Sequence, residues 1–443
     1  MEPIRPRLKV DKTFALLFTV MLAIAAGNTA LQSVLPALGR SLGAADSAVA
    51  AVFSVSALLW VIAAPFWANR SDRHGRRLMV LIGVGGFTVS LFLCGLFLML
   101  GINGVLGPVT TFVAFIIGRV IYGTFGSAAP PAVQAIVAGR TSRRRRTRAL
   151  TLLASAFGLG TITGPAIAPY LVMGSLWQGG PVVGLAGPAF AASAVGLAIW
   201  IAVLRLLPRE EAKAHGAAVA YPSIGGQTSG ASVTAAVSER TSSNIGYFDA
   251  RVRGWMITGL VMGHAQAMTG QAIGFLVIDR LHVTPVEALQ PTGLVLMMGA
   301  GSALLAQWGL IPMLDLKPRA LVLVGLAVAA LGCAATGTAT SISGIGMGYA
   351  LASLGFGFAR PGFTAGSSLA VGPESQGSVA GKVTSINGAA FVLGPSIGVG
   401  LYELWRPLPY LTAAGWLLAA VVYAFLSLNS DKRHRPAPPP GHP

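Results

Sequence analysis

Apolar runs long enough to cross a lipid bilayer recur along nearly the whole chain. Each crossing of the hydrocarbon core needs roughly 20 apolar residues in a helix. The runs between charged or turn-rich breaks predict twelve spans: 14–38, 48–68, 78–100, 109–138, 149–172, 182–206, 254–278, 289–312, 319–338, 343–371, 379–401 and 409–428. Because a backbone in lipid must satisfy its own hydrogen bonds, we expect each run to be a helix.

The composition supports the same class of protein. Charged residues make up only 10% of the chain and hydrophobic residues 54%, whereas charged residues are roughly 25% of soluble domains. Disorder needs low hydrophobicity, and a collagen fold needs a Gly-X-Y period that the 57 glycines do not show. The sequence therefore predicts an all-α polytopic membrane protein.

The distribution of basic residues predicts how the chain is oriented. Lys and Arg total 31 against 14 Asp and Glu, for a net charge of +17. If both termini are cytoplasmic, the outer loops hold only Arg40, Arg280 and Arg406, and cytoplasmic loops are the basic ones in membrane proteins. The positive charge is thus an orientation signal, and we expect no nucleic-acid partner. We expect a multi-pass membrane protein with both termini in the cytoplasm.

An internal repeat divides the chain into two parts. Gly164-Pro165 recurs as Gly394-Pro395, and Phe125-Gly126 recurs as Phe356-Gly357 at nearly the same offset. Repeats of this kind occur in transporters that place their substrate between the repeats. The predicted organisation is a cytoplasmic tail (1–13), a six-helix bundle (14–206), a flexible Ala, Gly, Ser and Thr-rich cytoplasmic linker (207–253), a second six-helix bundle (254–428) and a disordered cytoplasmic tail (429–443).

A short basic loop after the second span resembles a known signature. The run Asp72-Arg73-His74-Gly75-Arg76-Arg77 is similar to the loop motif G-x-L-a-D-R-x-G-R-R/K of the major facilitator superfamily, although Ala68 and Arg70 depart from its first part. The resemblance implies the twelve-helix, pseudo-symmetric fold of that family over about residues 14–428. It also implies that Asp72, Arg73, Gly75, Arg76 and Arg77 latch the cytoplasmic side in the outward-open state. From the residues alone, a basic loop that only sets topology is the alternative.

The fifth span contains a second motif. Residues 158–169 are similar to the motif G-x-x-x-G-P-x-x-G-G of the drug:proton antiporter branch, with Ala168-Pro169 in place of the final pair of glycines. This resemblance favours export over import. Small residues four apart let helices approach closely, and proline permits bending. We therefore expect Gly160, Gly164, Pro165, Gly394 and Pro395 to form helix-packing contacts.

Two arginines fall inside predicted spans, Arg119 in the fourth and Arg360 in the tenth. A cation at the bilayer centre costs at least ~2.5–3.5 kcal/mol on insertion scales, so each is expected to face a cavity or a partner. The surroundings of Arg119 are similar to the family motif R-x-x-x-G, which implies a role in proton coupling. The alternative for Arg119 is a structural bond to backbone carbonyls. For Arg360, binding of an anionic group and pairing with carbonyls both stay open.

Polar residues within the spans predict a substrate cavity. The candidates are Asn28, Gln32, Trp60, Tyr122, Gln134, Gln266, Gln271 and Asn387. Such residues often join helices instead of binding ligands, so we expect about half of them to line the cavity.

Proton coupling is less clearly encoded. No Asp or Glu falls at the centre of a predicted span, and His264 is the deep ionisable residue that titrates near neutral pH. We therefore group His264 with Arg119 and Arg360 as candidates for proton coupling or for a charge clamp. Facilitated diffusion or exchange without protons is the alternative.

Enzyme chemistry has little support in the sequence. Residues 394–398 match G-x-S-x-G, but this motif needs a strand-to-helix turn and the match lies in a predicted membrane helix. The chain has no Walker loop, no H-E-x-x-H and no Cys/His cluster with metal-ligand spacing. We expect no enzyme activity, no cofactor, no metal and no ATP-driven pumping.

The family resemblance implies a secondary active transporter of the cell inner membrane that exports small, drug-like amphipathic molecules by alternating access. Its expected partners are the small-molecule substrate, the proton and membrane lipid, and the expected state is monomeric. One alternative is an importer or exchanger of an organic anion or metabolite, with Arg119 and Arg360 as charge clamps. A non-transporting membrane scaffold or sensor is the alternative from another class.

Overall fold

The computed structural model describes residues 12–141, 143–175, 180–208, 245–372 and 375–428. The first half consists of α1 (Lys12–Ser41), α2 (Asp46–His74), α3 (Arg76–Ile102), α4 (Pro108–Phe125), η1 (Gly126–Ala128), α5 (Ala129–Arg140), α6 (Arg143–Ile167), η2 (Ala168–Leu171), β1 (Met173–Ser175), β2 (Val182–Gly184) and α7 (Gly187–Leu206). The second half consists of α9 (Arg253–Leu281), α10 (Leu289–Leu304), η3 (Leu305–Leu310), α11 (Ile311–Leu314), α12 (Pro318–Thr338), α13 (Ile342–Leu369), α14 (Gln376–Leu404) and α15 (Leu408–Ser427).

Each half crosses the membrane six times. The short helices join into longer rods, because α4, η1 and α5 continue over Pro108–Arg140 and α10, η3 and α11 over Leu289–Leu314. Eleven helices in the described part of the chain are long and apolar enough to span a membrane. The twelfth crossing is α9, whose hydropathy is lowered by polar residues such as His264, Gln266 and Gln271. The predicted twelve-helix fold of two six-helix bundles is confirmed.

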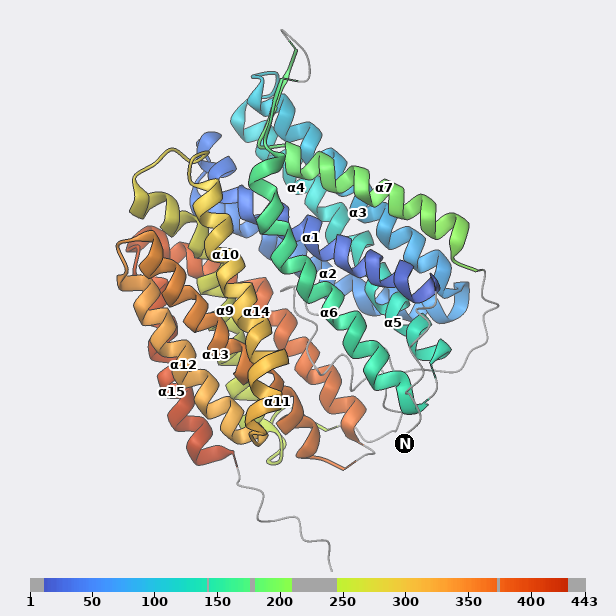
Figure 1. Ribbon diagram of the computed structural model, residues 1–443, viewed down its shortest axis with the longest axis vertical. Helices are drawn as coiled ribbons and strands as arrows, with labels where there is room; N and C mark the ends of the chain where they lie inside the picture. The colour runs from blue at the N-terminus through green and yellow to red at the C-terminus, as the bar shows by residue number, and fades with distance from the viewer. Residues whose placement is uncertain (1–11, 142, 176–179, 209–244, 373–374, 429–443) are drawn as a thin grey trace, which may run out of the picture.

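The two halves use corresponding helix contacts. In the first half α1 packs along α6, and in the second half α9 packs along α14. Figure 1 shows α1–α7, in blue to green, as one bundle and α9–α15, in yellow to red, as the other. We call the side where α1 begins and α15 ends the terminal face, and the opposite side the hairpin face.

Glycines make these helix contacts close. A Cβ at Gly160 of α6 would lie 2.5 Å from the Leu22 carbonyl oxygen of α1. Thr29 Oγ1 donates a hydrogen bond to the Gly160 carbonyl at 3.2 Å. In the second half, a Cβ at Gly394 of α14 would lie 2.5 Å from Ala267 Cβ of α9. Only small residues allow this separation, so glycine sets the position of α1 and α9.

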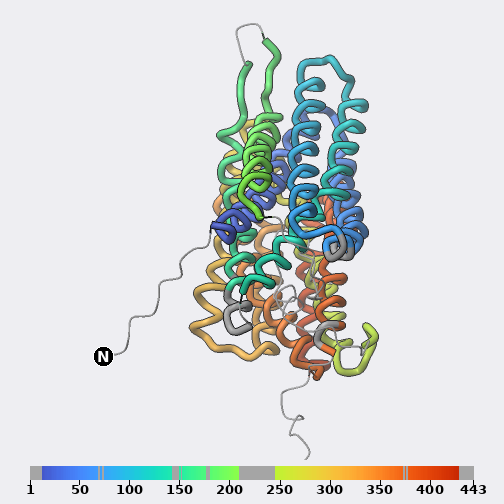
Figure 2. Tube along the Cα trace, turned by 90° about the vertical axis from the view of Figure 1, so that its right-hand side faces the viewer, coloured from blue at the N-terminus to red at the C-terminus, as the bar shows by residue number. Residues whose placement is uncertain are grey.

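A β-hairpin changes the predicted start of the sixth span. Strand β2 pairs antiparallel with β1, with Met173 opposite Gly184 and Ser175 opposite Val182. Asn103 at the end of α3 fixes the hairpin, because its side chain donates to the Val182 carbonyl and accepts from the Val182 amide, both at 2.8 Å. The helix therefore begins at Gly187 instead of residue 182. Figure 2 shows the strands projecting at the end of the molecule opposite the end of α15.

The predicted linker differs from the structure at its end. Residues 209–244 lie outside the described residues, as do 1–11 and 429–443 of the predicted tails. Residues 245–252 are ordered against the second half, where Ile245 and Val252 are buried. The Ile245 amide donates to Ser378 Oγ at 3.2 Å. These apolar side chains gain from burial, which explains why residues 245–252 pack on the second half.

The close contact between α6 and α1 predicts that Gly164→Ala destabilises the protein. Its added methyl would meet the Ala26 carbonyl and lie 2.8 Å from the Ala30 amide nitrogen, both of which are backbone atoms. Such overpacking costs about 1–3 kcal/mol. Thermal unfolding in detergent micelles is expected at a lower midpoint than for the wild type.

The matched control is Gly400→Ala in α14, where a Cβ meets nothing within 4 Å. It is expected to leave the midpoint unchanged or to raise it, since alanine favours a helix over glycine by up to ~1 kcal/mol. Equal midpoints for the two variants would contradict the packing account.

Candidate functional site

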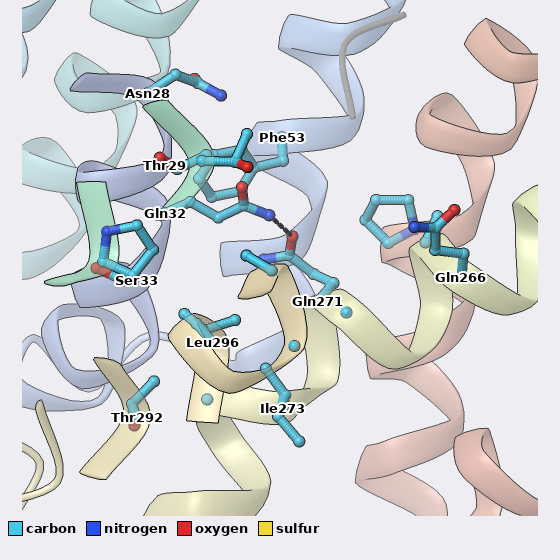
Figure 3. Close-up of a pocket in the computed structure, with 18 of the residues that line it drawn as sticks. Asn28, Thr29, Gln32, Ser33, Phe53, Gln266, Gln271, Ile273, Thr292 and Leu296 are labelled. Carbon is cyan, nitrogen blue, oxygen red and sulfur yellow. Dashed lines mark hydrogen bonds between the residues drawn. The ribbon is translucent and has the colours of Figure 1, made fainter. Parts of the chain in front are cut away.

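A cavity of about 170 Å³ lies between the two halves. We call it the central cavity. It is lined by α1, α2, α4 and α6 of the first half and by α9, α10, α13 and α14 of the second. Its lining mixes amides, hydroxyls, aromatic rings and prolines (Figure 3). The helix pairs brought together by glycine, α1 with α6 and α9 with α14, all contribute to this lining.

Two glutamines join the halves across the central cavity. Gln32 Nε2 of α1 donates to Gln271 Oε1 of α9 at 3.1 Å, as Figure 3 shows. Each amide retains further donors and acceptors beyond this bond. The pair can therefore exchange its mutual hydrogen bond for bonds to a ligand.

Arg119 places a buried cation in the cavity wall. Its side chain is 2% exposed, and it belongs to the lining. Nη2 donates to Asn28 Oδ1 at 3.0 Å and to Ser56 Oγ at 3.3 Å. The Phe53 and Tyr122 ring centroids lie 5.1 Å and 4.6 Å from its Cζ. Nε and Nη1 have no hydrogen-bond partner in the described structure, so the predicted cation is held by side chains and not by backbone carbonyls.

Arg360 forms a similar arrangement in the second half. It is also 2% exposed, and its Nη2 donates to Gln266 Oε1 at 2.5 Å. The Phe391 ring centroid lies 5.9 Å from its Cζ. Arg360 itself stands behind the lining, to which Gln266 and Phe391 belong. Within the described chain its Nε and Nη1 again have no partner.

The predicted cavity residues separate into two groups. The lining contains Asn28, Gln32, Gln266 and Gln271. Outside it are Trp60, Tyr122, Gln134 and Asn387, which are buried among helices. Trp60 packs on Tyr122 with 5.2 Å between ring centroids, so it faces a protein ring and not the cavity.

Several lining residues were missed in the sequence. They are Thr29, Ser33, Phe53, Thr161, Thr292, Tyr349, Ser353 and Phe391. Threonine, serine and aromatic residues are common in membrane helices, so residue type alone does not mark them. Helical spacing from Asn28 and Gln32 places Thr29 and Ser33 on a neighbouring part of the same face of α1, which is the signal that was available.

His264 bonds within its own helix. Its Nδ1 is 2.8 Å from the Leu260 carbonyl oxygen, one turn earlier in α9. Since a carbonyl only accepts, Nδ1 carries the hydrogen and Nε2 is the atom that can take up a proton. His264 is not part of the cavity lining.

An ion-pair cluster joins the halves at the hairpin face. Arg40 at the end of α1 donates to Asp279 Oδ1 of α9 at 2.5 Å and to Asp46 Oδ2 of α2 at 2.6 Å. The Tyr402 hydroxyl donates to Asp279 Oδ2 at 2.5 Å, and Arg406 Nε lies 3.3 Å from the same oxygen. We call these five residues the Asp279 cluster. The Ser47 amide, which donates to Glu403 Oε1 at 2.8 Å, adds a further bond between the halves.

The predicted latch loop is a tight turn between α2 and α3. Gly75 separates the helices with φ 91°, a conformation that favours glycine. Arg76 Nη1 donates to the Ala135 carbonyl at 3.0 Å, and Arg77 donates to the Leu204 carbonyl. Both contacts lie within the first half. The side chains of Asp72 and Arg73 lie outside the described part of the structure.

Two other predicted features can be located. Pro165 and Pro395 belong to the cavity lining as well as to the glycine-packed helices α6 and α14. Among the described residues, no group of three or more His, Cys, Asp or Glu side chains is placed to hold a metal ion.

Comparison with curated proteins finds bacterial drug-resistance proteins among the relatives of this chain. Multidrug resistance protein 1 of Bacillus subtilis (strain 168) is 28% identical over 163 residues, which are 37% of this chain and 39% of that relative. This match therefore spans about two-fifths of the relative's length. The class H tetracycline resistance protein of Pasteurella multocida is 23% identical over 444 residues, covering 96% of each chain.

Solved structures share the fold at low sequence identity. A bacterial homologue of the human lysosomal transporter Spinster, in an inward-facing and occupied conformation, has a TM-score of 0.70 at 12% identity, covering 96% of this chain and 97% of that one. The human organic anion transporter MFSD10 has a TM-score of 0.64 at 17% identity, covering 94% of this chain and 100% of that one.

A family model gives the assignment. The model described as Major Facilitator Superfamily matches residues 17–395, which includes nearly all of the first half and most of the second. Together with the two six-helix halves, this match shows that the chain belongs to the major facilitator superfamily.

Proposed function

We propose that this protein is a secondary transporter that exports small organic molecules by alternating access. The observation that carries the proposal is the central cavity, which both halves line and which the Asp279 cluster bridges at the hairpin face. Parting the halves at that face would break the Arg40–Asp279 ion pair and open the cavity to the side of the membrane on which that face lies. Movement of this kind about a site between repeats is how such folds transport.

The direction and the substrate are inferred from relatives and from the cavity. Relatives carry the names multidrug resistance protein and tetracycline resistance protein. Amide and hydroxyl groups beside aromatic rings suit a small amphipathic molecule. We propose drug-like organic compounds as the substrates and export as the direction.

The orientation follows from charge. Cytoplasmic termini put the basic loops inside, as the distribution of Lys and Arg favours. The terminal face is then cytoplasmic, and the Asp279 cluster closes the outer side in this conformation. We propose that the protein works as a monomer in the inner membrane of a bacterial cell and that no chemical reaction accompanies transport. We also propose that the loop residues hold the cytoplasmic side closed when the outer side opens; they are Asp72, Arg73, Gly75, Arg76 and Arg77.

Transport itself is tested by counterflow in proteoliposomes made with purified protein. Vesicles loaded with an unlabelled tetracycline or a lipophilic dye are expected to accumulate the labelled compound transiently. Empty vesicles and vesicles without protein are the controls. A complete lack of counterflow across a panel of such compounds would contradict the proposal and favour the scaffold alternative.

The Asp279 cluster predicts the effect of Asp279→Asn. Removing this charge weakens the ion pair with Arg40, which joins the halves, and the contact with Arg406, which lies within the second half. The outward-open population is expected to rise about tenfold, which corresponds to ~1.4 kcal/mol. Spin labels at the exposed positions Ala45 and Trp405, on opposite halves of this face, are expected to report a larger share of long distances.

Glu287→Gln is the control, since Glu287 accepts from Thr284 within the same short connection. It is expected to leave the distance distribution unchanged. The same distribution in the Asp279→Asn and wild-type proteins would show that the cluster does not hold the face closed.

We also propose that export is coupled to protons through His264 Nε2. His264→Asn is expected to abolish export driven by a pH gradient while counterflow without a gradient persists. His282→Asn is the matched control, because His282 caps α9 with φ 52° and asparagine tolerates that conformation. Full pH-driven flux in the His264→Asn protein would exclude this histidine as the coupling group.

A further inference from the structure

We propose that the central cavity selects organic anions, with Arg119 as the residue that binds the anionic group. This inference rests on the proposed transport function and names the substrate class of the same site. The ligand class is a carboxylate or sulfonate attached to an aromatic or apolar body.

The cavity lining has a net positive charge. Among the residues that the structure describes, Arg119 is the one charged side chain in it. The carboxylates whose side chains the structure describes are Asp46, Asp249, Asp279, Glu287, Asp315 and Glu403, and none of these belongs to the lining. A positive site surrounded by low-dielectric walls attracts anions and repels cations.

Arg119 is oriented but not neutralised. Asn28 and Ser56 both bind Nη2, so they fix the guanidinium without supplying negative charge. Nε and Nη1 keep their hydrogens unpaired, as far as the described residues show, although the side chain is 2% exposed. The free-energy cost of removing a charge from water is compensated only by a close opposite charge with good hydrogen bonds. Arg119 belongs to the lining, so a carboxylate in the cavity that reaches its guanidinium would supply both.

The second arginine adds to the same field. Arg360 has its own unpaired Nε and Nη1, and it reaches the lining through Gln266, at 2.5 Å. Arg360 lies outside the cavity lining, so its positive charge acts from a greater distance. Its loss is expected to weaken anion binding less than the loss of Arg119.

The remainder of the lining defines the body of the ligand. Phe53 lies beside Arg119 and Phe391 beside Arg360, and both rings line the cavity. Apolar groups such as Pro36, Ile273 and Leu296 complete the walls. Aromatic faces favour a planar apolar group next to the anion. An inorganic anion would satisfy the charge but leave these surfaces without a partner.

The experiment uses three probes that share one ring system and differ in charge: 2-naphthoate, 2-naphthamide and 2-naphthylmethylammonium. Binding to the purified full-length protein is measured by isothermal titration calorimetry. We expect 2-naphthoate to bind at least tenfold more tightly than either of the other two. Preference for the neutral or cationic probe, or equal binding of all three, would overturn the proposal.

Variants locate the anion. Arg119→Gln is expected to lower the affinity for 2-naphthoate at least tenfold and to change that for 2-naphthamide little. Arg119→Lys, which keeps the charge, is expected to retain part of the preference even if the glutamine variant folds poorly. Arg205→Gln removes an exposed cation at the end of α7 and is expected to have no effect. Unchanged charge selectivity in both Arg119 variants would overturn the assignment.

Two further measurements distinguish a wrong ligand class from a failure of the proposed transport function. Chloride is added to the titration, and displacement of 2-naphthoate at equal concentrations would indicate an inorganic anion site and overturn the proposal. Counterflow of the three probes is measured in proteoliposomes. Counterflow of the neutral or cationic probe alone would support transport and overturn the anion class, whereas anion binding without counterflow of any compound would support the site and contradict the proposed function.

Discussion

Close contact between helix backbones is the constraint on which the cavity depends. Lipid tails are as apolar as leucine, so membrane helices associate through close packing and hydrogen bonds and not through the hydrophobic effect. Glycines of α6 hold α1, and glycines of α14 hold α9, at distances that no larger residue permits. The two helices held in this way, α1 and α9, carry Asn28, Gln32, Gln266 and Gln271 into the lining. The glycines of α6 and α14, which have no side chain, thus set the position of the polar groups.

The distribution of charge gives the two ends of the molecule different roles. At the hairpin face, carboxylates and arginines neutralise each other, and the Arg40–Asp279 ion pair between the halves breaks if the halves part. In the centre, Arg119 has amide and hydroxyl partners but no carboxylate in the described structure. The first arrangement suits a closure and the second suits a binding site. One chain therefore uses paired charge to hold a conformation and unpaired charge to attract a ligand.

The fold was largely predictable from the sequence, because a crossing of the bilayer requires a long apolar helix whatever surrounds it. The helix contacts at Gly164 and Gly394 also follow from local residue type. The β-hairpin at Met173–Gly184 was missed, since strands this short leave little periodicity, and its bonds to Asn103 come from another helix. The order of residues 245–252 was missed because docking against α14 depends on tertiary contact.

The site was only half predictable for a similar reason. Residue type identifies which polar groups lie in a span, but the direction in which each faces depends on helix rotation. Gln32 and Gln271 meet in the cavity, whereas Gln134 and Asn387 face other helices. The arginines of the Asp279 cluster were placed at the outer side, yet nothing in the sequence showed that Arg40 pairs with a carboxylate of the other half. Pairing across an interface is a property of the assembled bundles.

Accessibility of the cavity from each side of the membrane tests the account most directly. A single cysteine replaces Ala300, which lines the cavity, while the native Cys94 and Cys333 are buried. Oriented membrane vesicles are treated with an impermeant thiol reagent from one side and then from the other. The account predicts labelling from both sides, with the ratio shifted toward the hairpin face by Asp279→Asn. Labelling from one side alone, whatever the variant or ligand, would contradict alternating access.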